Sequence, residues 1–406
     1  MTMGRGIRFV ACVMLACALL PAPGRALDRP VRIGVLSDMS GPFSDQVGAG
    51  SVAAARLALE DFGRESGGVQ VELLSADHQN KPDIGLGIAR RWLDQEQVAA
   101  IVDLPNSGVA LAVANLMRER NRVALASSAM TSDLTGKFCA PTTVQWVSDT
   151  WAQGSATARA LAERGARAWY FLTVDYALGH ALERDATRAL AENGGRSTGS
   201  SRLPLGTADF SSALLSAQGS GAQVLALANT GADMINAIKQ AGEFGLTPKM
   251  TLAALFIQLS DTHSLGLEAA QGLQLVSAFY WARTDATRAF SDRFAAVMNG
   301  RRPTEDHAGV YSTTLAYLRA VRDARTIEGD KVVAEMRKAP IADPLFGTVT
   351  IRPDGRAVHD LYLYEVKPPS ESKGPYDYYK YVLTIPGERA FRPLQDGGCA
   401  VKGAGN

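Results

Sequence analysis

Residues that build metal and redox sites are scarce in this 406-residue sequence. The 5 histidines are scattered, and none has a cysteine or a second histidine at the spacing of metal ligands. There is no P-loop, and Gly48-Ala49-Gly50 is interpreted as the opening of a helix. We therefore predict no metal, no cofactor and no enzymatic activity. A histidine brought to a serine by folding is the alternative that would make an enzyme.

An excess of one charge is also missing. The sequence has 42 lysines and arginines against 41 acidic residues, for a formal net charge of +1. No basic stripe interleaved with aromatic residues occurs, which argues against a nucleic-acid partner. With 46% hydrophobic residues, the composition is that of a globular protein. The length favours two domains, because single cores stop growing near about 250–300 residues.

Long apolar runs are confined to the amino terminus. Arg5 and Arg8 precede an apolar stretch over Phe9–Leu20, and small residues lead to Ala26. This pattern is typical of a secretory signal peptide, and the stretch is too short to span a membrane comfortably. We predict a signal peptide over residues 1–26, cleaved near Ala26, and a periplasmic mature protein. The alternatives are a membrane anchor and a lipoprotein modified at Cys17.

Cysteine is rare as well. Cys12 and Cys17 lie in the predicted signal, which leaves Cys139 and Cys399 in the mature chain. An even pair in an oxidising compartment favours a disulfide, which would pin the carboxyl-terminal tail to the loop near Phe138. Two free thiols are the alternative.

The sequence does contain a regular alternation of strands and helices. It begins with an apolar strand at Val31–Leu36, a Gly/Pro loop and an amphipathic helix from Gly48. Repetition of this unit predicts an α/β fold with doubly wound parallel sheets. Short apolar segments at 142–146 and 279–282 predict crossings between two lobes. The predicted boundaries are 27–146 and 281–345 for lobe 1, and 147–280 and 346–406 for lobe 2.

Small polar loops follow several of the predicted strands. In open α/β sheets, ligands bind at these strand ends, where helix N-termini favour anions. The candidates in lobe 1 are Ser40, Phe43, Asn106, Ser107, Ser127, Ser128 and Ala129. The candidates in lobe 2 are Asp175, Tyr176, Asn229, Thr230, Phe256 and Gln258. The first set could hold a carboxylate, and the second suits a largely apolar ligand with one polar end.

Several of these residues also have purely structural interpretations. A single serine in such a loop is more often a helix cap, and Phe256 fits core packing equally well. Tyr280 and Trp281 fit a hinge slightly better than a cleft lining. The tyrosines between Tyr376 and Tyr379 are interpreted as the surface of an edge strand.

Several motifs carry a resemblance to a known family. They are GVLSDMSGPFSD near the start, VDYALG in the second half, and the run from TADFSS to GEFGL. They resemble the periplasmic solute-binding proteins of the branched-chain amino-acid (Leu/Ile/Val-binding) type, which serve ABC importers. The resemblance implies two Rossmann-like α/β lobes joined by three crossover segments, the type I periplasmic binding protein fold. It also implies closure around one small solute and delivery to an ABC permease complex in the inner membrane. We expect the protein to be a monomer.

The resemblance also bears on the ligand. In relatives that bind α-amino acids, the loops matching Ser107 and residues 128–130 hold the carboxylate. A tyrosine matching Tyr176 and an acid near Gln258 help to hold the rest, including the ammonium. Because the Gln258 side chain is uncharged, it cannot form an ion pair with an ammonium group. This favours a ligand that is an acid without an amine. The runs at 37–44 and 132–136 are similar to a subgroup associated with aromatic acids.

We therefore predict a small carboxylate as the ligand, with an aromatic acid favoured. One alternative is a branched-chain or other amino acid, whose amine could pair with Asp38, Asp103 or Asp261. Another is a sensor that presents its ligand to a membrane receptor. A cell-envelope enzyme on the same scaffold is a third.

Overall fold

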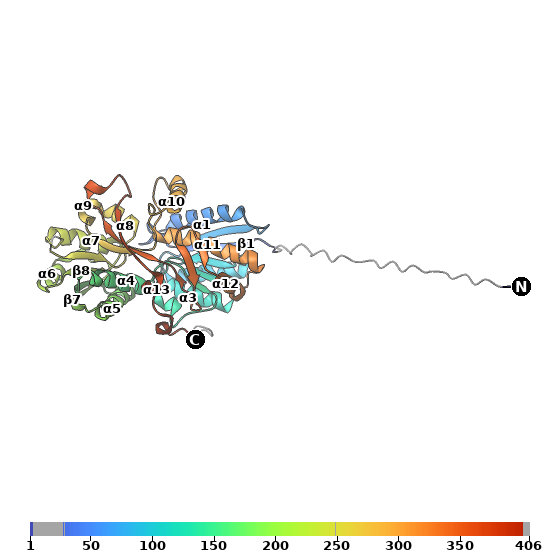
Figure 1. Ribbon diagram of the computed structural model, residues 1–406, viewed down its shortest axis with the longest axis horizontal. Coiled ribbons are helices and arrows are strands. Elements are labelled where there is room, and N and C mark those ends of the chain that lie inside the picture. The colour runs from blue at the N-terminus through green and yellow to red at the C-terminus, as the bar shows by residue number, and fades with distance from the viewer. Residues whose placement is uncertain (3–26, 28, 248, 401–406) are drawn as a thin grey trace.

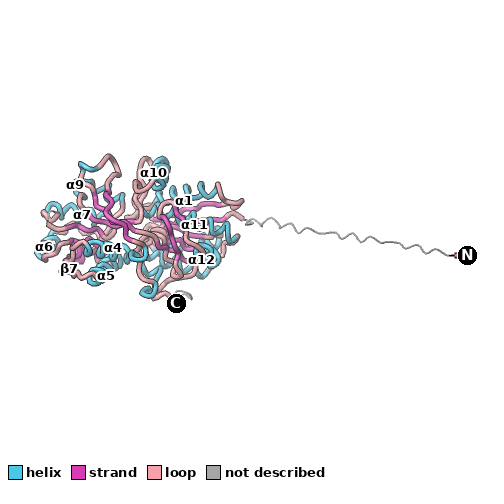
Figure 2. Tube along the Cα trace, viewed as in Figure 1, coloured by secondary structure: helices cyan, strands magenta, loops and turns pink. Residues whose placement is uncertain are grey.

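Two β-sheets, each with its own helices, form the two ends of the molecule (Figure 1). The computed structural model describes residues 1–2, 27, 29–247 and 249–400. The predicted cleavage site and nearly all of the predicted signal peptide therefore lie outside the described residues. Figure 2 shows the strands inside and the helices covering them at both ends.

The first sheet has five parallel strands in the order β2-β1-β3-β4-β5. They are β1 (Val31–Ser37), β2 (Val71–Asp77), β3 (Ala100–Asp103), β4 (Val123–Ala126) and β5 (Thr143–Gln145). The helices between them are α1 (Gly48–Gly63), α2 (Pro82–Arg91, continued by a π-helical turn over Trp92–Glu96) and α3 (Ser107–Glu119). β3 and β4 are buried along their whole length, as expected for parallel strands covered on both faces.

The chain returns to this sheet late in the sequence. The returning helices are α10 (Asp285–Val297), α11 (Glu305–Ala324) and α12 (Gly329–Arg337). α11 packs against α1 and β3, and α12 packs against α11 and β4. We call the first sheet with these helices lobe 1. Its core therefore combines segments that lie more than half the chain apart.

The second sheet is mixed and defines lobe 2. Its order is β15-β14-β10-β9-β8-β6-β7, in which β14 runs antiparallel to both β10 and β15. The strands are β6 (Ala168–Val174), β7 (Arg196–Leu203), β8 (Val224–Ala228), β9 (Thr251–Ala254), β10 (Gln274–Ser277), β14 (Leu361–Val366) and β15 (Tyr379–Ile385). The helices are α4 (Thr150–Glu163), α5 (Ala177–Glu192), α6 (Ser211–Gly219), α7 (Gly231–Glu243), α8 (Leu259–Leu265) and α9 (Leu267–Ala270). The predicted two-lobed α/β class is confirmed, with antiparallel strands at one edge of the second sheet.

The segments between the lobes carry a small third sheet. Its strands are β11 (Ile341–Asp343), β12 (Gly347–Ile351) and β13 (Ala357–Val358), and a short helix, α13 (Gly387–Ala390), follows β15. Residues 142–146, predicted as the first crossing, instead contribute β5 to the first sheet. The crossing to lobe 2 follows that strand, between Gln145 and Thr150. The lobe boundaries given above stay predictions.

Two buried charges hold the crossing segments in place. The Glu305 carboxylate accepts hydrogen bonds from Ser148 N, 3.2 Å away, and from the Ser148 hydroxyl in the first crossing. It also accepts from the Ser277 hydroxyl (2.7 Å) and from Ala278 N (3.0 Å) in the second crossing. The Arg356 guanidinium donates to the carbonyls of Gln145 and Val147 and pairs with Asp149. One residue thus bridges two crossings, and another ties the third to the first.

The tyrosine-rich segment before β15 is packed, which contradicts the edge-surface interpretation for two of its members. Tyr378 and Tyr379 are buried, and the Tyr379 ring lies 5.0 Å from that of Tyr280, centroid to centroid. The Tyr280 hydroxyl and the Trp281 Nε1–H both donate to the Tyr376 carbonyl. The aromatic residues bury too much apolar area to stay on a surface when such partners are available. The hinge role of Tyr280 and Trp281 stays a prediction.

A disulfide joins Cys139 to Cys399, as predicted, with the two Cα atoms 5.6 Å apart. Because 260 residues separate the cysteines, the bond removes much of the freedom of the unfolded chain. The chain-entropy model puts this stabilisation at roughly 5 kcal/mol as an upper value. We expect the double variant Cys139→Ser/Cys399→Ser to melt several degrees below the parent protein in a thermal-unfolding scan. Parent protein treated with a reductant is the control and should match the variant. Equal melting of oxidised and reduced protein would contradict this expectation.

Candidate functional site

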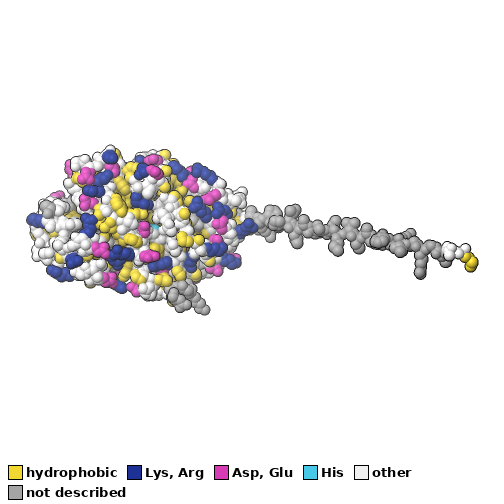
Figure 3. Space-filling model, in the orientation of Figure 1, with side chains coloured by type: hydrophobic (Ala, Val, Ile, Leu, Met, Phe, Trp, Pro, Cys, Tyr) yellow, Lys and Arg dark blue, Asp and Glu magenta, His cyan; other side chains and the backbone are white. Residues whose placement is uncertain are grey.

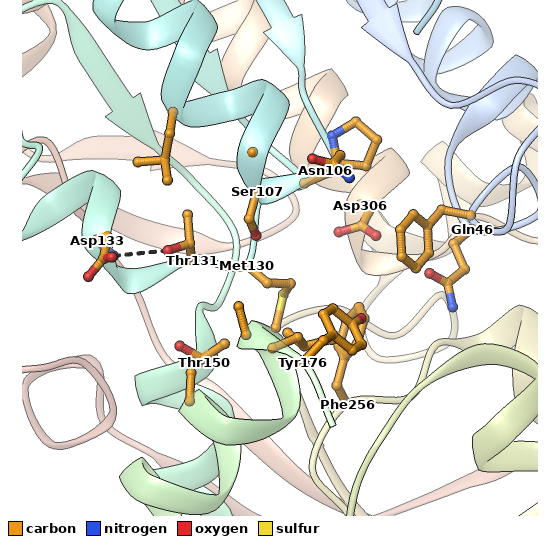
Figure 4. Close-up of a pocket in the computed structure, with 18 of the residues that line it drawn as sticks. Gln46, Asn106, Ser107, Met130, Thr131, Asp133, Thr150, Tyr176, Phe256 and Asp306 are labelled. Atoms are coloured by element: carbon orange, nitrogen blue, oxygen red, sulfur yellow. Dashed lines mark hydrogen bonds between the residues drawn. The ribbon is translucent and has the colours of Figure 1, made fainter. Parts of the chain in front are cut away.

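A cavity of about 360 Å³ lies between the two lobes and is lined by residues from both. Figure 4 shows side chains from lobe 1 above it and Tyr176 and Phe256 of lobe 2 below it. The lining residues are Phe43, Gln46, Val47, Pro105, Asn106, Ser107, Gly108, Leu111, Ser128, Met130, Thr131, Asp133, Thr150, Tyr176, Ala177, Leu178, Ala181, Phe256 and Asp306. The walls are largely apolar, with a few polar groups, which is the usual composition of a small-molecule site.

The first turn of α3 supplies backbone donors to the upper wall. The loop before it passes through left-handed backbone at Asp103 (φ 87°) and Leu104 (φ 63°), an uncommon conformation for residues other than glycine. Asn106 caps the helix by accepting from Val109 N at 3.0 Å. The N–H groups of Ser107 and Gly108 precede that capped position, in a turn that lines the cavity. Such a helix start favours an anion.

In the loop after β4, polar groups of Ser127, Ser128 and Ala129 already form hydrogen bonds within the protein. The Ser127 hydroxyl accepts from Asp103 N, and the Ser128 hydroxyl donates to Asp103 Oδ1. The Ala129 carbonyl accepts from Gln145 Nε2. Only Ser128 of these three lines the cavity, and its proton is directed at Asp103. Ser107 is therefore the better placed hydroxyl donor for a ligand.

The lower wall comes from the strand ends of lobe 2. Tyr176 stands at the start of α5 and Phe256 follows β9, and both line the cavity. Asp175 lies outside the lining and pairs with His180 at 2.7 Å on the surface. Asn229 and Thr230 are buried at the end of β8, also outside the lining. The predicted aromatic residues thus reach the cavity, and the predicted polar neighbours do not.

Of the other candidates, Phe43 lines the cavity and Ser40 donates to Asp77 on the outer side of the first loop. Gln258 caps α8 together with Asp261 and lies outside the lining. Its Nε2 donates to Asp306 Oδ2 at 3.1 Å, and its Oε1 accepts from Glu305 N. Gln258 therefore supports the wall rather than forming it.

Two acids line the cavity, Asp133 and Asp306, and the sequence predicted neither as a ligand-binding residue. Asp306 is the buried one. Burial, together with Glu305, Asp103 and Asp261 nearby, raises the pKa of Asp306 well above its usual value. Burial likewise raises the pKa of Asp103 and of Asp261 to about 6. The sequence signal was an acidic pair at the start of α11, a position that favours negative charge. The apolar periodicity predicts a helix only from His307 to Arg325, so the acidic pair lies outside the helix that the sequence predicts.

The expectation that the sequence contains no G-x-S-x-G motif is wrong. Gly195-Arg196-Ser197-Thr198-Gly199 has the letters of a nucleophile elbow. That motif requires a sharp strand-to-helix turn, whereas Ser197 and Gly199 lie within β7. The Ser197 hydroxyl donates to the Gly199 carbonyl on an exposed part of the strand. The geometry of an elbow is not present here.

Within the described part of the chain, no cluster of three or more His, Cys, Asp or Glu residues could hold a metal ion. No helix there has both the length and the apolar character needed to cross a bilayer. On the face seen in Figure 3, basic and acidic side chains are interspersed.

The fold agrees with comparisons to known proteins. A family model described as periplasmic binding protein matches residues 30–375, so the chain belongs to that family. Its members are substrate-binding proteins of ABC transporters and are located in the periplasm. The recognition made from the sequence motifs is confirmed.

Particular relatives make the type more specific. A periplasmic binding protein from Burkholderia mallei is 44% identical, with a TM-score of 0.86 over 92% of this chain and 99% of its own. A branched chain amino acid ABC transporter periplasmic ligand-binding protein from Burkholderia xenovorans LB400 is 40% identical, with a TM-score of 0.86 over 91% and 99%. Leu/Ile/Val-binding protein homolog 6 of Brucella melitensis is 28% identical over 280 residues, 67% of this chain and 70% of that protein. A solute binding protein from R. palustris in complex with benzoate shares the fold at 18% identity, with a TM-score of 0.77 over 92% and 100%.

Proposed function

We propose that this chain is the extracytoplasmic solute-binding component of an ABC importer. It captures a small carboxylate, with an aromatic acid favoured, and closes its lobes around it by hinge motion before delivery to an inner-membrane permease. The observation that carries the proposal is the interlobe cavity, with backbone donors on one wall and aromatic side chains on the other. A ligand bridging these walls would hold the lobes together.

The cavity chemistry supports an anion with a flat apolar body. The Ser107 hydroxyl and the N–H groups in the first turn of α3 can donate hydrogen bonds to a carboxylate. The site therefore needs no basic side chain to hold an anion. Phe43, Tyr176 and Phe256 offer ring faces and edges. The benzoate complex of the R. palustris protein lends further support, because it has the same fold.

The second candidate is a branched-chain or other amino acid. It is favoured by the name of the Burkholderia xenovorans relative, which is 40% identical to this chain. A thermal-shift screen separates the two, with benzoate and cinnamate in one set and leucine and valine in the other. Stabilisation by the aromatic acids supports the proposal. Stabilisation by leucine or valine alone would replace it by the second candidate.

The carboxylate contact is tested by Ser107→Ala. A hydrogen bond to a charged group contributes about 1.5–3 kcal/mol, so we expect the dissociation constant of the best acid to rise about tenfold or more. Isothermal titration calorimetry measures this change. Ser211→Ala is the matched control, because Ser211 is the first residue of α6 and lies outside the cavity lining. An unchanged affinity in Ser107→Ala would remove Ser107 from the proposed site.

A further inference from the structure

The carboxyl group of Asp306 is an unusual component of the cavity wall. Asp306 is only 3% exposed, yet it lines the cavity. Oδ2 accepts a hydrogen bond from Gln258 Nε2, whereas Oδ1 has no hydrogen-bond partner among the described residues. Figure 4 shows the carboxyl between Ser107 and Gln46 on the upper wall. A buried polar atom left unpaired at a cavity points to a group on a ligand.

Three other buried acids surround Asp306, and each has its own donors. Asp261 accepts from Gln46 Nε2 and from Gln258 N. Asp103, at the end of β3, accepts from the Ser128 hydroxyl at Oδ1. Its Oδ2 has no partner among the described residues either, but Asp103 does not line the cavity. Glu305 accepts the four hydrogen bonds from the two crossing segments described above. None of the described residues that line the cavity is a lysine, an arginine or a histidine.

A fourth negative charge in this region would be costly. Burial removes water from Asp306, and Asp103, Asp261 and Glu305 repel its ionised form, so its pKa is raised well above the usual range. Protonation relieves both costs. A carboxyl kept neutral in this way can donate a hydrogen bond, which an ionised one cannot.

We propose that Asp306 is a specificity-determining residue that donates a hydrogen bond from protonated Oδ1 to an uncharged acceptor oxygen of the ligand. The inference rests on the proposed capture of a carboxylate and adds a second polar group to that ligand, a hydroxyl or carbonyl oxygen. An ammonium in the same place would have to deprotonate Asp306 and lose its own water. An uncharged oxygen requires neither step, so the structure favours a hydroxy or keto acid over an amino acid.

The experiment compares benzoate, its three monohydroxy isomers and tyrosine by calorimetry. We expect one hydroxy isomer to bind the parent protein about tenfold more tightly than benzoate, the size of one neutral hydrogen bond. Asp306→Asn keeps a neutral donor of the same shape and should retain this preference within about threefold. Asp306→Leu should bind benzoate but lose the preference. Circular dichroism checks the fold of both variants, and the Asn variant alone suffices if the Leu variant does not fold.

The pH dependence of ligand affinity distinguishes hydrogen-bond donation by Asp306 from a purely structural role. Above the range near pH 6 in which Asp103 and Asp261 titrate, affinity of the parent protein for the preferred isomer should fall as the pH rises through the pKa of Asp306, while the affinity of Asp306→Asn stays flat. Glu305 on its own helix, Asp103 on β3 and Asp261 on α8 are the charged groups that act on it. Tyr176 and Asp133 are the other titratable residues that line the cavity. Protonation of Asp103 and Asp261 near pH 6 removes negative charge and leaves Asp306 protonated.

The possible failures are distinguishable. Equal binding of benzoate and every isomer, or tight binding of tyrosine that Asp306→Asn abolishes, would overturn the donor role and leave carboxylate capture intact. Binding of none of these probes would overturn the proposed ligand class and the donor role together.

Discussion

Replacing Arg356 by methionine is expected to lower the free energy of unfolding by about 3–5 kcal/mol, the usual cost of breaking a buried ion pair. Arg356 is 1% exposed and pairs with Asp149 at 3.3 Å. It also donates to the carbonyls of Gln145 and Val147. Methionine fills the aliphatic volume but leaves a buried carboxylate and two carbonyls without their donor. Urea unfolding followed by circular dichroism measures the change.

The control for this variant is Arg389→Met. Arg389 pairs with Glu163 in lobe 2, but the two side chains are 54% and 48% exposed. Exposed pairs contribute at most about 1 kcal/mol, so the control should stay close to the parent protein. Similar losses in the two variants would show that burial of the Arg356 pair is not what stabilises the first crossing.

Glu305→Gln should also have a large effect, a loss of about 3 kcal/mol. The carboxylate oxygens accept from Ser148 N and its hydroxyl on one side and from the Ser277 hydroxyl and Ala278 N on the other. A glutamine places an NH₂ group against one of these donor sets. Each buried group left unsatisfied costs about 1–3 kcal/mol.

Thermal and urea unfolding measure the loss, and Glu328→Gln is the control. Glu328 pairs with Lys331 on the surface, with 49% of its side chain exposed. A Glu305→Gln variant as stable as the control would mean that the crossing segments hold their positions without this carboxylate. The two variants also probe different contacts, because Arg356 ties the third crossing to the first and Glu305 bridges the first and the second.

Local periodicity was enough to predict the regular elements. The sequence predicts strands at 123–126, 168–174, 224–228 and 274–277 and a helix at 177–192. β4, β6, β8, β10 and α5 have these bounds. Their signals are continuous apolar runs or long amphipathic patterns with clear Gly or Pro stops. The helices α8 and α9 were missed because each spans two turns or fewer, which is too short for a period to appear.

The cavity was predicted only in part, for a related physical reason. Ligand sites in open α/β sheets follow the ends of strands. This rule of topology was enough to predict four of the lining residues, Phe43, Ser107, Tyr176 and Phe256. Contacts such as Gln258 with Asp306, or Ser128 with Asp103, join side chains far apart in the sequence, and no local pattern reveals them. Those contacts decide which polar atoms are left for a ligand. The sequence therefore predicted the loops at the site better than the chemistry at its wall.

The late return of the chain to lobe 1 bears on the order in which the protein can fold. β3 and α1 are exposed on one side until α11 is synthesised, and β4 until α12 follows it. A fragment ending before Glu305 would present the apolar faces of α1 and β3 to water. The amino-terminal lobe thus has to wait for residues up to Arg337 before its core closes. Much of the polypeptide must therefore be synthesised before the core of either lobe can be complete.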